Sequence, residues 1–111
     1  MDLKSILNKT KSDFISVSDV EGNVIEFTER QEFEYKKEVS LGGNFFFKSA
    51  SDFFEKVLNE NNIEQVNLSS EDTNILFIKN SSQELVFTIY SKNEINPSII
   101  KFLINKYARH N

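Results

Sequence analysis

The side chains that most often carry out chemistry in proteins are scarce in this sequence. His110 is the only histidine and stands next to the last residue, and there is no cysteine. Disulfides, thiolate metal sites and cysteine nucleophiles are therefore excluded, and a Ser-His-Asp triad or a zinc site lacks its other members. We interpret His110 as a solvated residue that suits the C-terminal dipole of a helix.

Carboxylates could still hold a magnesium ion, and glycines could still cradle a phosphate. Asp19 and Glu21 flank one predicted turn and residues 71–74 (EDTN) form a second acidic turn, but neither has the spacing of a calcium-binding loop. The pair Gly42-Gly43 lacks the GxxxxGK[ST] pattern of a phosphate-binding loop. The sequence therefore predicts no catalytic residue, no metal site and no cofactor, and we expect a protein that is not an enzyme.

Composition and charge narrow the remaining classes. The chain has 111 residues, of which 39% are hydrophobic and 27% are charged, a balance typical of one soluble globular domain. No apolar run is long enough for a signal peptide or a transmembrane helix, so we expect a cytoplasmic protein without membrane insertion. The net charge is −4 and the lysines are spread along the sequence, which argues against nucleic acid as a partner.

Hydrophobic periodicity predicts the elements that would position any site. Asp2 caps a short amphipathic helix, and residues 13–29 alternate on both sides of a Gly22-Asn23 turn, as in a β-hairpin. Asn96-Pro97 begins a last amphipathic helix. The predicted order is a helix at 2–11, the hairpin at 13–29, a long helix with one phase over 35–58, strands at 64–69, 74–79 and 84–90, and the closing helix.

The strand patterns predict how these elements are layered. Residues 74–79 and 84–90 are apolar on both faces, as in central strands that are covered on each side. In the strand 64–69 only one face is apolar, with Val66 and Leu68, as expected at a sheet edge. The long helix can cover one face and the two terminal helices the other. The predicted fold is α/β, a three-layer α-β-α sandwich with one five-stranded antiparallel sheet and the topology α-β-β-α-β-β-β-α.

The long central helix has more apolar surface than one core contact requires. Five of the eleven phenylalanines lie between residues 45 and 54. The apolar arc spans about 140°, against about 100° for a single core stripe. One side of the arc can pack on the chain's own sheet and the other on a second copy, or the whole arc can be core. The interface that we expect in the first case comprises Phe47, Ala50, Phe54, Leu58, Val66 and Leu68.

In this order of elements the chain resembles the Roadblock/dynein light chain family, which is related to the longin and profilin-like folds. The resemblance rests on FISVSDVEGNVIEF (14–27) as the first hairpin, the long central helix, the strands within 63–90 and the closing helix. It covers nearly the whole chain. The phenylalanines of the central helix depart from the family, which favours small residues there.

The resemblance implies one Roadblock-like domain over residues 1–111 and a sheet order of 2-1-5-4-3. Members of the family commonly dimerise by pairing the edge strand that corresponds to 64–69 into a continuous sheet, with both central helices side by side. Such dimers serve as platforms for a small Ras-like GTPase or as adaptors in larger assemblies. The resemblance thus implies a non-catalytic, homodimeric scaffold or regulator.

A PAS-like sensor domain is the alternative, because it also has the order β-β-α-β-β-β. Its phenylalanines would line a pocket for a small molecule or a flavin. PAS domains usually place several short helices between their second and third strands. The single helical phase over 35–58 and the two terminal helices favour the Roadblock interpretation.

Overall fold

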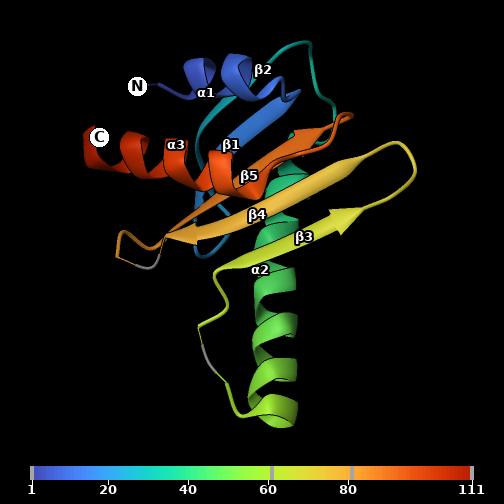
Figure 1. Ribbon diagram of the computed structural model, residues 1–111, viewed down its shortest axis with the longest axis vertical. Coiled ribbons are helices and arrows are strands. Elements are labelled where there is room, and N and C mark those ends of the chain that lie inside the picture. Colours follow the sequence, from blue (N-terminus) through green and yellow to red (C-terminus); the bar gives the residue numbers. More distant parts are fainter. Residues whose placement is uncertain (1, 61, 81, 111) are drawn as a thin grey trace.

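The computed structural model describes residues 2–60, 62–80 and 82–110, without the side chains of residues 108–110. The role predicted for His110 therefore lies outside the described side chains. Figure 1 follows the chain from the first helix in blue to the last in red. In chain order the elements are α1 (Leu3–Thr10), β1 (Phe14–Asp19), β2 (Val24–Glu29), α2 (Lys36–Phe53), the π-helical turn η1 (Phe54–Leu58), β3 (Gln65–Ser69), β4 (Asn74–Asn80), β5 (Leu85–Ser91) and α3 (Pro97–His110).

The five strands form one antiparallel sheet in the order β2-β1-β5-β4-β3. The predicted order of elements and the sheet order implied by the resemblance are both confirmed. Gly22 in the β1–β2 turn has a φ of 93°, a conformation that glycine adopts readily. Asp19 supports the same turn, because its carboxylate accepts hydrogen bonds from the backbone N–H groups of Glu21 and Asn23, each at 2.9 Å.

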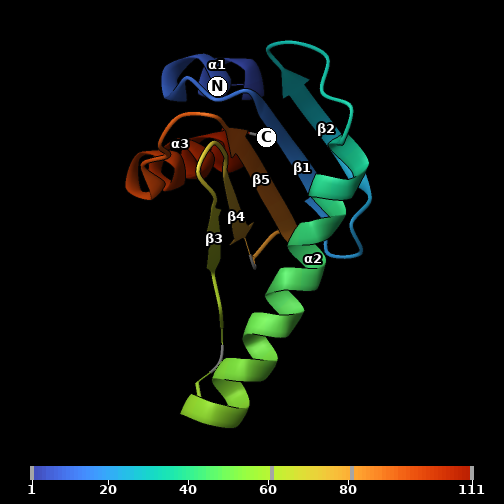
Figure 2. The same ribbon diagram turned by 90° about the vertical axis from the view of Figure 1, so that its right-hand side faces the viewer.

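Helices cover both faces of the sheet, which confirms the three-layer sandwich. Figure 2 shows α2 on one side of the sheet and α1 and α3 on the other. Side chains alternate along a strand, so each face contributes its own set of residues to a core. The larger core lies under α1 and α3 and comprises Leu3, Ile6, Leu7, Ile15, Val17, Leu76, Ile78, Phe87, Ile89, Ile100, Leu103, Ile104 and Tyr107.

On the opposite face, small side chains let the N-terminal half of α2 approach the sheet. The hydroxyl groups of Ser16 on β1 and Ser40 on α2 are buried and hydrogen bond to each other at 2.8 Å. A Cβ atom added to Gly43 would lie 2.9 Å from Cδ1 of Phe77, so this close approach requires glycine. One turn further along, Phe47 packs with Phe77 and Val86 in the smaller core.

Candidate protein interaction surface

The C-terminal half of the long helix projects beyond the sheet. In Figures 1 and 2, α2 begins over the strands and its end stands clear of them. The buried residues of α2 are Ser40, Gly43 and Phe47, and η1 has none. The helix therefore loses its cover after Phe47, although its sequence remains rich in apolar residues.

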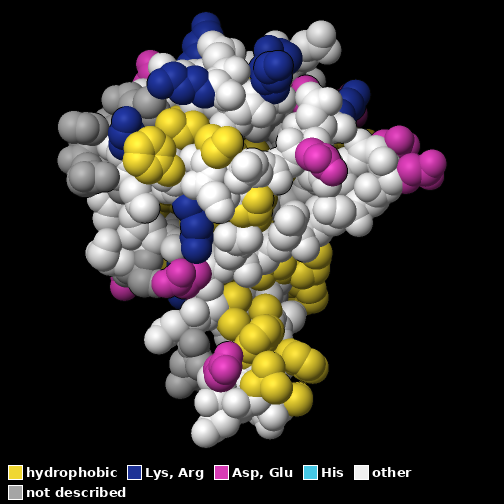
Figure 3. Space-filling model, in the orientation of Figure 1, with side chains coloured by type: hydrophobic (Ala, Val, Ile, Leu, Met, Phe, Trp, Pro, Cys, Tyr) yellow, Lys and Arg dark blue, Asp and Glu magenta, His cyan; other side chains and the backbone are white. Residues whose placement is uncertain are grey.

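Large apolar side chains are exposed on this projecting part. Phe53 is 56% exposed, Val57 63% and Leu58 51%, while Phe54 is half-buried. Figure 3 shows hydrophobic side chains gathered over the projecting end of the helix. We call Phe53, Phe54, Val57 and Leu58 the projecting surface. An apolar group of this kind on a helix without cover is typical of a protein interface.

The end of the helix is fixed by backbone hydrogen bonds. Asn59 has a left-handed conformation with a φ of 55°, and its N–H donates to the carbonyl of Phe54. The N–H of Glu60 donates to the same carbonyl at 3.1 Å. The last turn is therefore closed in the manner common at helix C-termini, and the chain leads from there to β3.

Strand β3 lies at the edge of the sheet, and among the described residues it pairs with β4 alone. Its sequence, QVNLS, contains no charged residue and no proline, the residues that commonly prevent pairing with another strand. Val66 and Leu68 are half-buried and pack toward the smaller core. The backbone edge of β3 is therefore free to pair with a strand of another chain.

The structure separates the residues of the predicted interface. Leu58 is exposed on the projecting surface with the half-buried Phe54, and Ala50 is half-buried one turn earlier. Phe47 is only 6% exposed and belongs to the core of its own chain. The interface expected from the sequence did not include Phe53 and Val57, which the structure exposes on the projecting surface. The signal that could have identified them is Gly43, whose missing side chain marks the side that faces the sheet.

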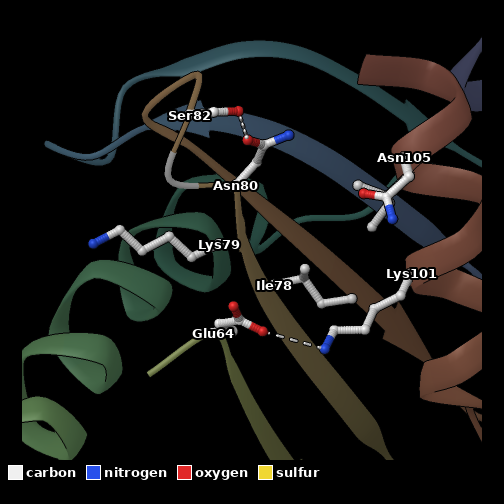
Figure 4. Close-up of a pocket in the computed structure, with 8 residues that line it drawn as sticks. Glu64, Ile78, Lys79, Asn80, Ser82, Lys101 and Asn105 are labelled. Carbon is white, nitrogen blue, oxygen red and sulfur yellow. Dashed lines mark hydrogen bonds and ion pairs between the residues drawn. The ribbon is translucent and has the colours of Figure 1, made fainter. Parts of the chain in front are cut away.

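A surface cavity of about 430 Å³ lies between β4 and α3, with Glu64 at its rim. Figure 4 shows that Lys101 points toward Glu64, whereas Lys79 points away to the other side of β4. The Lys101 Nζ atom is 3.6 Å from a Glu64 carboxylate oxygen, and the Asn80 side chain accepts a hydrogen bond from Ser82 at 2.8 Å. These polar side chains are paired with each other, Lys101 with Glu64 and Ser82 with Asn80, and they do not form a recognisable catalytic arrangement.

Of the carboxylates considered for a metal, Asp19 stabilises its own turn. Asp19 accepts three hydrogen bonds within its turn, including one from the Asn23 side chain at 3.0 Å, and these bonds lower the pKa of its carboxyl group below the ordinary value. In residues 2–60, 62–80 and 82–107, no group of three or more His, Cys, Asp or Glu side chains could hold a metal ion. Within the described helices, none is long and apolar enough to cross a membrane.

No protein-family model and no curated protein matches the sequence. Solved structures match the fold. The gliding protein MglB from Thermus thermophilus has a TM-score of 0.76 and 12% identity, over 94% of this chain and 78% of that chain. A structure of MglB with a tetrameric arrangement has a TM-score of 0.76 and 12% identity, over 94% and 77% of the two chains. A Roadblock/LC7 domain from Streptomyces avermitilis has a TM-score of 0.68 and 6% identity, over 82% and 74%.

The chain has the Roadblock fold. The Roadblock resemblance seen in the sequence is therefore confirmed. At identities of 6–12%, these comparisons concern the fold alone. The packing under α2 also disfavours the PAS-like alternative, in which phenylalanines line a ligand pocket. Phe47, Phe77 and Val86 fill this space, and Gly43 leaves too little room there for even one added methyl group.

Proposed function

We propose that residues 1–111 form one Roadblock-like domain, which acts as a non-catalytic, homodimeric scaffold for a small Ras-like GTPase or as an adaptor in a larger assembly. The observation that carries the proposal is the projecting surface of α2 and η1. The chain's own sheet leaves this surface uncovered, so the large apolar side chains of Phe53 and Val57 are more than half exposed. Burying such side chains against a partner is favourable, by about 25 cal/mol for each Å² of apolar area.

A second copy of the chain fits this surface, because one two-fold axis can bring together both the β3 edges and the projecting helices of two chains. The edge of β3 offers unpaired backbone groups that an antiparallel copy of the same strand can satisfy. A helix that projects past its own sheet can then pack beside the equivalent helix of the partner. In the proposed dimer the projecting surface, with Leu58 and Phe54, supplies the helix contact, and β3, with Val66 and Leu68 behind it, supplies the sheet contact.

The GTPase part of the proposal is supported by the fold. Roadblock dimers commonly serve such GTPases, and one solved MglB with this fold has a tetrameric arrangement, which supports self-association. In this proposal the protein binds a nucleotide-dependent partner and does not turn over nucleotide itself. We place it in the cytoplasm, where Ras-like GTPases act.

Sedimentation velocity over a range from low to high micromolar concentration tests the dimer. We expect a dimer across most of this range, and a chain that stays monomeric at high micromolar concentration would refute the proposal. Ras-like GTPases encoded by the same genome, loaded with GDP or with a non-hydrolysable GTP analogue, should then be titrated into the protein by calorimetry. We expect affinity that depends on the nucleotide, and no hydrolysis of GTP by the scaffold alone.

A further inference from the structure

The helices α1 and α3 form a basic layer on an acidic protein. Residues 2–11 contain three lysines and one aspartate, and residues 97–110 contain two lysines, one arginine and no acidic residue. These two segments therefore have a net charge of +5 in a chain whose net charge is −4, so the other residues together have −9. Figure 2 shows the two helices side by side on the face of the sheet opposite α2.

Exposed apolar side chains lie within this basic layer. The inner side of α3 supplies Ile100, Leu103 and Ile104 to the core, whereas Ile99 on its outer side is 51% exposed and Phe102 is 56% exposed. Figure 3 shows a hydrophobic patch on this face of the molecule with lysine or arginine side chains around it.

The lysines around the patch are available to a partner. The Nζ atom of Lys106 lies 4.7 Å from the centre of the Phe102 ring. Lys9 borders a small groove of about 130 Å³ together with Ile99, and Glu94 is the one acidic residue among the described residues that line that groove. Among the described side chains, Lys4, Lys9 and Lys106 form no ion pair. Lys101 is the exception on this face, because it pairs with Glu64. We call Lys9, Ile99, Phe102 and Lys106 the basic-aromatic face.

We propose that the basic-aromatic face binds the surface of a membrane that contains anionic phospholipids. Phe102 and Ile99 enter the boundary between headgroups and acyl chains, while the lysines stay at the level of the lipid phosphates. Each lysine near such a surface adds to the attraction, and the acidic residues elsewhere in the chain are screened beyond a Debye length of about 8 Å. Adsorption of this kind requires no helix that spans the membrane.

The chemistry of the face favours lipid over an acidic protein. Its described cations are lysines on flexible stems spread over two helices, and mobile point charges of this kind suit a diffuse negative surface. The apolar side chains protrude from the outer side of a helix instead of lining a deep pocket. Figure 3 shows the hydrophobic patch of this face and the projecting end of α2 as two separate regions of the surface. The inference goes beyond the proposed function and does not depend on it.

Co-sedimentation with vesicles tests this proposal. One set of vesicles is pure phosphatidylcholine and the other contains three parts of phosphatidylserine to seven of phosphatidylcholine. We expect the protein to pellet with the second set only and to be released by salt. Lys106→Gln should lower the partition coefficient roughly five-fold, and the double variant K9Q/K106Q roughly twenty-five-fold. Phe102→Ser should also weaken binding while leaving the charge unchanged.

Lys48→Gln is the matched control, because Lys48 is exposed on α2 in the opposite layer and the charge change is the same. It should not alter vesicle binding, and circular dichroism should show that every variant is folded. The proposal is overturned if the wild-type protein ignores anionic vesicles at low salt, or if Lys48→Gln weakens binding as much as Lys106→Gln. Binding to poly-glutamate but not to vesicles would likewise overturn it and would assign the face to an acidic protein. A protein that binds vesicles as a monomer would refute the dimer alone.

Discussion

Replacing Phe53 by aspartate should abolish the proposed dimer without unfolding the chain. Phe53 lies on the projecting surface and is 56% exposed in the single chain. The change therefore removes little packing from the monomer, and a substitution at such a surface position typically alters the free energy of unfolding by less than about 1 kcal/mol. In the dimer, however, the same position would hold a charge in an apolar contact.

The expected loss follows from the exposed area. A phenylalanine offers about 200 Å², so a side chain that is 56% exposed presents about 110 Å² to a partner. At about 25 cal/mol for each Å², burying this area contributes about 2.8 kcal/mol for each chain. A two-fold interface buries it twice, which gives about 5.5 kcal/mol and a dissociation constant about four powers of ten weaker for Phe53→Asp.

Sedimentation velocity measures the dissociation constant, and a thermal melt followed by circular dichroism measures stability. Phe102→Asp is the matched control, because Phe102 is also 56% exposed but lies on α3 in the opposite layer. We expect the Phe53 variant to be a folded monomer and the Phe102 variant to be a folded dimer. A Phe53 variant that dimerises like the wild-type protein would refute the assignment of the projecting surface, and equal losses in both variants would show a non-specific effect.

Three further predictions concern stability. Gly43→Ala should lower the thermal midpoint, because the new methyl group would lie 2.9 Å from Phe77 and such overpacking costs about 1–3 kcal/mol. Gly42→Ala is the control: its new methyl group would have its nearest contact at 3.6 Å, so this change should be neutral or stabilising. A lower thermal midpoint for Gly42→Ala than for Gly43→Ala would contradict the packing of α2. Burial and a hydrogen bond to the Glu26 carboxylate raise the pKa of Tyr107 to about 12. The free energy of unfolding should therefore be unchanged below about pH 10 and fall as the pH rises toward the pKa of the folded state. Thermal melts of Tyr107→Phe should show a smaller fall. Hydrogen bonds lower the pKa of Asp19, so the native turn should lose stability as the pH falls below about 4, and thermal melts of Asp19→Asn should show a weaker dependence over the same range.

Local patterns in the sequence predicted most of the architecture. Alternation in residues 13–29 produces a hairpin because successive side chains of a strand point to opposite faces. The two strands within 74–90 are apolar on both faces, so both faces had to be covered, and the only helices left to do so were the long one and the two at the ends. The sheet order itself came from the family resemblance, since alternation does not say which strands are neighbours.

Tertiary structure decided which apolar residues became core and which became surface. Phe47 and Phe53 lie in the same apolar arc of one helix, yet they are 6% and 56% exposed, because the sheet ends beneath the helix between them. A helical period defines an angle around the axis but not the length over which another element covers the helix. The basic-aromatic face has a similar origin. Lys9 and Lys106 are far apart in the sequence, where the lysines look evenly scattered. The packing of α1 beside α3 joins them in one layer, with Lys9 near Ile99 and Lys106 over the Phe102 ring.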